Sequence, residues 1–171
     1  KKRISPERRT FNIGYLFLKK IYNELNIHKI CNDIQANYQF HFDLNEILSN
    51  LVLARIIYSY SKLETFKQCQ NFLEQPAFEL YDEYRSLNYL AENIDFIQES
   101  LFNNSKKVLK RNSKVIYYDC TNYFFEIDEE DELRKYGISK EHRPNPIVGM
   151  GLFMDGDGIP LSFNIYPGNQ N

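Results

Sequence analysis

The sequence predicts an α+β protein, in which a helical region over residues 1–110 precedes a set of antiparallel strands. Helix-breaking residues are rare in the first part, where Gly14 and Pro76 stand almost alone. From residue 115 onward, β-branched and aromatic residues are dense, and turn residues separate the runs. We therefore expect two domains, a helical one over 1–110 and an incomplete one over 111–171.

Capping patterns mark helix starts within the first part. Asp43 can cap a helix, with Glu46 three residues later as the return arm of a capping box. Phe42 and Ile47 are spaced as a hydrophobic staple across that start. The sequence Ser61-Lys62-Leu63-Glu64 repeats the capping signature and predicts a second helix start.

A longer helix is expected after Pro76, because apolar residues recur there at helical spacing. The run Asn103-Asn104-Ser105 predicts its end. The apolar stripe consists of Leu87, Leu90, Ala91, Ile94, Ile97 and Leu101.

Three runs in the second part predict strands, over residues 115–126, 147–154 and 159–166. The sequence Asp155-Gly156-Asp157-Gly158 between the last two predicts a tight hairpin turn. Pro160 disfavours a central position for the third strand. Read as half of a calcium loop, the turn fails, because Ile159 occupies the next ligand position and no Glu closes the loop.

Composition excludes several classes of protein. The chain is 43% hydrophobic and 26% charged, which suits a globular core, and no run of about 18 apolar residues predicts a membrane span. Its three cysteines are widely spaced and predict buried thiols rather than a disulfide or zinc site. It begins with Lys1 rather than Met, so we expect a piece of a longer protein.

Charge is segregated along the chain although the net charge is only −2. Residues 1–20 and 105–114 are basic, whereas residues 126–132 hold six acids and no base. The basic runs either form a DNA-binding patch or are solvated faces, and charge alone favours the second. The acidic run is interpreted as a solvated loop rather than a metal site.

Asp119 is the first candidate for chemistry. It lies within an apolar and aromatic strand, on the same face as Tyr117, Thr121 and Tyr123 by period two. A carboxylate in such a strand is costly unless it is paired or binds a metal. The alternative is an Asp at a frayed strand end or beside a Lys or Arg.

Several ordered motifs in residues 115–171 resemble the start of the catalytic domain of insertion-sequence DDE transposases of the IS-four type. The run Tyr117-Tyr118-Asp119-Cys120-Thr121-Asn122-Tyr123-Phe124-Phe125-Glu126 resembles the family's motif around its first catalytic Asp. Residues 133–144 resemble its Gly-x-Ser-Lys loop, and Gly158-Ile159-Pro160-Leu161 with Tyr166-Pro167-Gly168-Asn169 resembles its hairpin. Residues 76–110 match more loosely.

The resemblance implies an RNase H-like fold, in which three antiparallel strands open the sheet and the first carries Asp119. It also implies that Asp119 is a catalytic residue and a metal ligand. The family's second Asp and its Glu would lie beyond residue 171, so a Mg²⁺ or Mn²⁺ site is expected only with the complete triad.

DNA contacts are expected from three segments. The first is the basic N-terminus, Lys1 to Arg9, as an arm along the phosphate backbone. The others are the basic run with Lys106, Lys107, Lys110 and Arg111 and the loop with Lys140, His142 and Arg143. The alternative for the loop is a surface segment whose Arg pairs with the nearby acids. Residues 44–74 could form a helix-turn-helix, but the second helix is only weakly basic, which favours a plain helical hairpin.

The expected function is that of a DNA transposase, which cuts and joins transposon-end and target DNA as a homodimer in the bacterial cytoplasm at the nucleoid. The fragment alone is expected to be inactive. One alternative is a catalytically dead remnant that still binds DNA or a partner. Another is an RNase H-like nuclease.

Overall fold

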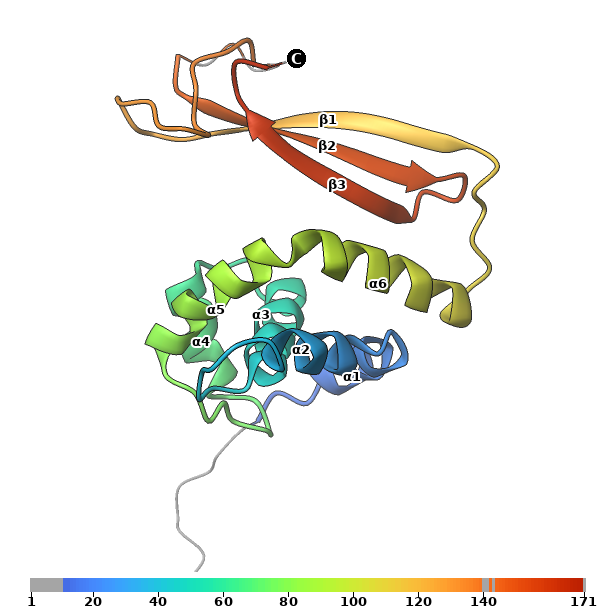
Figure 1. Ribbon diagram of the computed structural model, residues 1–171. Coiled ribbons are helices and arrows are strands. Elements are labelled where there is room, and N and C mark those ends of the chain that lie inside the picture. Colours follow the sequence, from blue (N-terminus) through green and yellow to red (C-terminus); the bar gives the residue numbers. More distant parts are fainter. Residues whose placement is uncertain (1–10, 140–141, 143, 171) are drawn as a thin grey trace, which may run out of the picture. The chain divides into compact units, whose positions relative to one another are not determined.

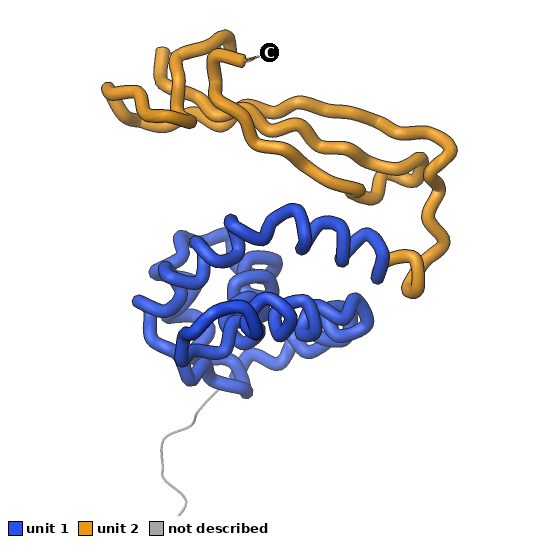
Figure 2. Tube along the Cα trace, viewed as in Figure 1, with its two compact units in different colours: residues 1–104 blue, residues 105–171 orange. Residues whose placement is uncertain are grey.

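The computed structural model describes residues 11–139, 142 and 144–170 of the chain. It divides into two compact units, residues 1–104 and 105–171 (Figure 2). The division falls inside the last helix rather than after residue 110, where the sequence analysis placed it. Figure 1 shows a helical first unit and a sheet in the second.

Unit 1 consists of helices. They are α1 (Tyr15–Glu24), α2 (Ile27–Gln35), α3 (Leu44–Ile57), α4 (Lys62–Cys69), α5 (Leu80–Glu92) and α6 (Ile94–Val108), whose last turn belongs to unit 2. The larger core cluster includes Ile30, Ile34, Leu44 and Ile47, and a smaller one centres on Tyr15 and Phe72. No helix in the described part of the chain is long and apolar enough to cross a bilayer.

The predicted start of α3 is confirmed in part. The Asp43 side chain accepts hydrogen bonds from the backbone N–H groups of Asn45 and Glu46, so it is the N-cap. The predicted return contact of the capping box, from Glu46 back to the start of its own helix, is wrong. The Glu46 carboxylate accepts from the backbone N–H of Ala77 instead, at 2.7 Å. A partner 31 residues away replaces the local one.

The long helix expected after Pro76 is wrong, since it is two helices that meet at Asn93. Asn93 leaves the helical conformation, with φ −108°, and its side-chain amide donates to the Tyr38 hydroxyl and the Tyr89 carbonyl. These bonds stabilise the break. The second of the two, α6, also continues past the predicted stop to Val108.

The three predicted strands are confirmed as one antiparallel sheet in unit 2. They are β1 (Ile116–Phe124), β2 (Ile147–Asp155) and β3 (Pro160–Pro167), in the order β1-β2-β3 (Figure 1). The predicted turn joins β2 to β3, where the Gly158 N–H donates to the Asp155 carbonyl and Gly158 has φ +77°. Pro160 begins an edge strand, where a missing N–H is tolerated.

Aromatic rings cover two glycines of the central strand. A Cβ on Gly151 would lie 2.6 Å from the Tyr118 hydroxyl oxygen, and one on Gly149 would lie 2.1 Å from the Tyr166 ring. Both rings therefore lie flat against β2, one from each neighbouring strand. Side chains on β2 at these positions would displace them.

Candidate catalytic site on the first strand

Asp119 lies near the middle of β1, opposite Leu152 of β2, which in turn lies opposite Phe163 of β3. Alternation along the strand puts Tyr117 and Thr121 on the same face, as the sequence analysis expected. The Asp119 side chain is exposed, so it does not carry the desolvation penalty that the sequence argument assumed.

The face of the sheet that carries Asp119 is otherwise apolar or uncharged. Its residues are Tyr117, Thr121 and Tyr123 of β1, Val148, Met150, Leu152 and Met154 of β2, and Phe163 and Ile165 of β3. Among the described residues, Asp119 is the single carboxylate on this face.

A divalent-metal site needs several oxygen ligands that converge on one point. No group of three or more His, Cys, Asp or Glu side chains in the described ranges could hold a metal ion. The residues present around Asp119 therefore do not fit a two-metal centre by themselves. Asp119 can supply one ligand of such a centre and no more.

Cys120 and two phenols occupy the opposite face of the sheet. Hydrogen bonding with the Cys120 thiol, and then partial desolvation, raise the pKa of Tyr118 to about 12. The same thiol raises the pKa of Tyr166. Neither phenol is therefore ionised near pH 7.

The acidic run forms a folded loop after β1. Asp131 accepts from the N–H groups of Leu133 and Arg134 and forms an ion pair with the Arg134 guanidinium. The hydrogen bond from that side chain, followed by the backbone bonds, lowers the pKa of Asp131 to about 2. Glu130 accepts from the Tyr136 N–H, and Arg134 lies over the Phe125 ring. Asp131 and Glu130 therefore bind groups within their own loop.

Three motif segments meet beyond this loop. Lys135 pairs with Ile147 at the start of β2, and the Gly168 N–H donates to the Leu133 carbonyl. A Cβ on Gly137 would lie 1.9 Å from the Gly168 carbonyl oxygen, and one on Gly168 would lie 2.1 Å from that of Ile147. Glycine is required at both positions because backbones approach too closely for a side chain.

The expected DNA-contact loop is only partly described. Lys140 and Arg143 lie outside the described residues. His142 is exposed, adopts φ +52°, and donates its N–H to the Ser139 carbonyl. The Asn122 amide of β1 donates to the Ile138 carbonyl at 3.4 Å, which connects the start of this loop to the strand of Asp119.

The lysine cluster, defined as Lys106, Lys107, Lys110 and Lys114, lies between the last turn of α6 and β1. All four side chains are exposed. Two of them occupy the last turn of α6, where cations also interact favourably with the helix dipole. The basic N-terminal run, residues 1–9, lies outside the described residues.

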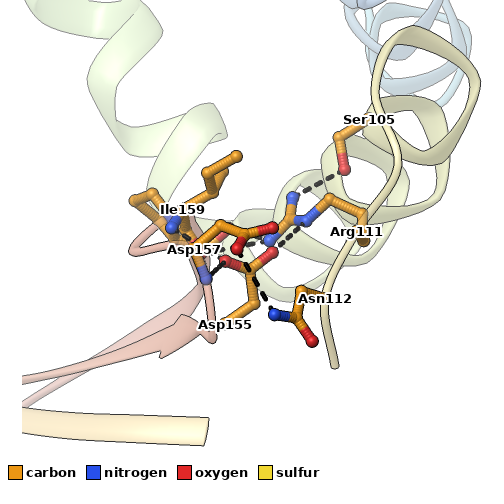
Figure 3. A network of polar contacts seen from close by, with 7 residues as sticks. Ser105, Arg111, Asn112, Asp155, Asp157 and Ile159 are labelled. Carbon is orange, nitrogen blue, oxygen red and sulfur yellow. Dashed lines mark hydrogen bonds and ion pairs between the residues drawn. The ribbon is translucent and has the colours of Figure 1, made fainter. Parts of the chain in front are cut away.

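Arg111 does not belong with these lysines as a candidate DNA contact (Figure 3). Its side chain is 5% exposed and forms an ion pair with the fully buried Asp155, with Nε 2.6 Å from Oδ2. It also donates to the Ser105 hydroxyl and to the carbonyls of Ile159 and Pro160. The guanidinium holds the hairpin turn against the segment before β1 and is not available to a phosphate.

The carboxylate of Asp155 completes the network in Figure 3. Its Oδ1 accepts from the N–H groups of Asp157 and Ile159. Desolvation raises the pKa of Asp155, but the Ile159 N–H, the Arg111 guanidinium and the Asp157 N–H together hold it below its ordinary value. No sequence signal separated Arg111 from its basic neighbours, because its partner is 44 residues away.

Comparison with family models, curated proteins and solved structures returned no match for this chain.

Proposed function

We propose that this chain carries the first catalytic carboxylate, Asp119, of an insertion-sequence DDE transposase with an RNase H-like catalytic domain. The observation that carries the proposal is the position of Asp119 near the middle of the first of three antiparallel strands in the order β1-β2-β3. That position and order agree with what the resemblance of residues 115–171 implies.

The glycines of two motifs that resemble the family add support to the proposal. Gly137 and Gly168 belong to separate stretches that resemble the transposase family, and each allows a backbone contact that a side chain would block. The two stretches therefore have a shared structural reason to hold glycine. A chance resemblance between short motifs has no reason to produce this contact.

Phosphodiester cleavage and strand transfer by such an enzyme need two divalent ions held by a set of carboxylates. Asp119 would supply one ligand, and the second Asp and the Glu would come from chain that follows residue 171. Transposon-end and target DNA would be the substrates.

The test is an Asp119→Asn substitution in the protein encoded by the whole reading frame that contains this chain. The probe is a supercoiled plasmid that carries the DNA flanking that frame, with Mg²⁺ present. We expect cleavage to fall by a factor of about 10³ or more, because groups that act as one unit fail together. Binding to the flanking DNA should stay within about twofold, since one carboxylate contributes little to phosphate contacts.

The matched control is Asp128→Asn, which removes an exposed carboxylate from the loop after β1. It should cleave like the unmodified protein. Cleavage by the Asp119→Asn protein at the unmodified rate would refute the assigned role of Asp119.

A DNA-binding module without catalysis is the second candidate, and the exposed lysine cluster is the observation that favours it. The reading frame beyond residue 171 separates the two candidates. A later Asp after a strand and a Glu on a helix support the transposase, and an immediate stop supports the module. An RNase H-like nuclease would cleave the plasmid without producing joined strand-transfer products.

A further inference from the structure

Unit 1 contains a small cleft between α1, α3 and the segment that follows α4. Its volume is about 220 Å³. The stacked rings of Tyr15 and Phe72, with centroids 4.3 Å apart, form one wall. Drug-sized ligands occupy cavities of roughly 300–1,000 Å³, so this cleft suits a group no larger than a single side chain.

The hydrogen-bond donors that line this cleft already bind acceptors within the same chain. The Lys19 ammonium forms an ion pair with Glu74, and the Tyr15 hydroxyl donates to the same carboxylate. The Asn50 amide and the Ser49 hydroxyl both donate to the Glu46 carbonyl. A ligand that needs hydrogen-bond donors from the protein would therefore find few.

Acceptors remain. Glu46 uses Oε1 to accept from the Ala77 N–H at 2.7 Å, and within the described part of the chain its Oε2 has no hydrogen-bond partner. The Asn50 side-chain oxygen likewise accepts from no described residue. Lys19 and Glu74 neutralise each other, which leaves Glu46 as the charged residue of the cleft without a counter-ion among the described residues.

We propose that this cleft binds a guanidinium group, supplied by an arginine side chain of a binding partner. A guanidinium presents several hydrogen-bond donors in one plane, and its positive charge would pair with the Glu46 carboxylate. The proposal does not depend on the role assigned to Asp119.

The experiment uses the whole ¹⁵N-labelled chain and methylguanidinium as the probe, followed by amide NMR. We expect saturable shifts confined to residues around the cleft, including Asn50 and Ala77, with a dissociation constant of about 1 mM or weaker for so small a probe. Methylammonium, with the same charge but no planar fork, should bind more weakly. Shifts that do not saturate, or equal binding of the two cations, would overturn the proposal.

Two substitutions locate the site. Glu46→Gln keeps an acceptor for Ala77 but removes the charge, and should weaken binding about tenfold. Its control is Glu99→Gln, an exposed glutamate on α6, which should bind like the unmodified chain. Unchanged binding by a folded Glu46→Gln chain would refute the site.

Asn50→Asp should change the affinity for methylguanidinium in the opposite direction, and it tests the site if Glu46→Gln does not fold. A second carboxylate in the cleft should tighten methylguanidinium binding, and weaker binding would contradict a cation site. Free L-arginine and N-acetyl-arginine amide then distinguish the source of the group. Binding of either supports the guanidinium site, and tighter binding of the amide identifies an arginine within a polypeptide.

Discussion

Two buried carboxylates show how differently single residues are accommodated. Asp155 is fully buried but has a guanidinium and two N–H groups as partners. Glu83 of α5 is 2% exposed, and its Oε1 has no hydrogen-bond partner among the described residues. The same side-chain charge is therefore compensated in one unit and left largely uncompensated in the other.

Breaking the Arg111–Asp155 pair should destabilise unit 2. We expect Arg111→Met to lower the melting temperature by about 5–10 °C, because it leaves a buried carboxylate without its counter-ion. Lys110→Met removes an exposed neighbouring charge and should change it little. Thermal unfolding followed by circular dichroism measures both, and equal melting temperatures for the two variants would contradict this account.

Acid should weaken the same network. The folded-state pKa of Asp155 lies below its ordinary value of 3.8, so the stability it contributes is present above that pH and is lost as pH falls through the folded pKa. Asp155→Asn should therefore show a shallower loss of stability below about pH 4 than the unmodified chain. Denaturant titrations from pH 2 to 6 test this, and parallel curves would be the contrary result.

Glu83 should behave in the opposite way. Burial raises its pKa above the ordinary 4.5, although the charge of Lys62 lowers it in part. A raised carboxyl pKa means that the folded state holds the proton more tightly, so stability falls as pH rises from about 4.5 through the folded pKa. Glu83→Gln should raise the melting temperature at pH 7 by a few degrees.

The control for Glu83 is the exposed Glu99→Gln, which should leave the melting temperature unchanged. Melting temperatures measured at pH 4 and pH 7 show directly whether the charged Glu83 stabilises or destabilises the chain. A Glu83→Gln chain that is less stable than the unmodified chain at pH 7 would show that the carboxylate has a stabilising partner.

At the scale of elements, the end of α6 and the segment before β1 present the lysine cluster. A charge reversal of the whole basic run, which includes Arg111, would break the buried pair with Asp155 as well as remove surface charge. A clean test of DNA binding therefore changes lysines only.

We expect duplex DNA to bind weakly and with strong salt dependence. Changing Lys107, Lys110 and Lys114 to Glu should weaken binding to all sequences about equally, because phosphate contacts carry no sequence information. The slope of log affinity against log salt should become less negative by roughly 0.9 for each phosphate that the protein no longer neutralises.

Fluorescence anisotropy at several salt concentrations measures this change. The matched control changes Lys20, Lys29 and Lys67 of unit 1, which are also exposed. An equal loss of affinity in the control would mean that net charge, rather than the lysine cluster, determines binding.

On the scale of the whole molecule, β1 is largely exposed, whereas most residues of β2 are buried or half-buried. Apolar side chains are exposed on both faces of β1, including Ile116 and Tyr118 on one and Tyr117 and Tyr123 on the other. A strand that is apolar on both faces is typical of a sheet covered on both sides. Both faces of β1 therefore carry apolar surface of the kind that a covered sheet buries.

The 171-residue chain by itself should neither nick nor join DNA. Asp119 is the single carboxylate on its face of the sheet within the described ranges, and one carboxylate cannot hold two metal ions. Incubation of the purified chain with supercoiled plasmid and Mg²⁺ or Mn²⁺ tests this. Nicking that survives Asp119→Ala would exclude Asp119 as its source, and nicking that Asp119→Ala abolishes would show that one carboxylate suffices.

Local pattern in the sequence determined several helix starts and the three strands of this protein. Capping residues marked Asp43 and Ser61 as helix starts, and period-two runs with the Asp155–Gly158 turn predicted three antiparallel strands. These features depend on contacts between residues a few positions apart, so they can be read from neighbours in the chain. The face of β1 that carries Asp119 followed from the same alternation.

Only the tertiary structure decided which charged residues are buried and which remain at the surface. Arg111 lies in a uniformly basic run, yet it alone reaches Asp155. The Glu46 carboxylate accepts a hydrogen bond from the distant Ala77 N–H rather than from the start of its own helix. The break at Asn93 likewise depends on Tyr38, which lies 55 residues earlier. In each case the deciding partner is remote in sequence, and a charge or amide is buried only where such a partner offsets its desolvation.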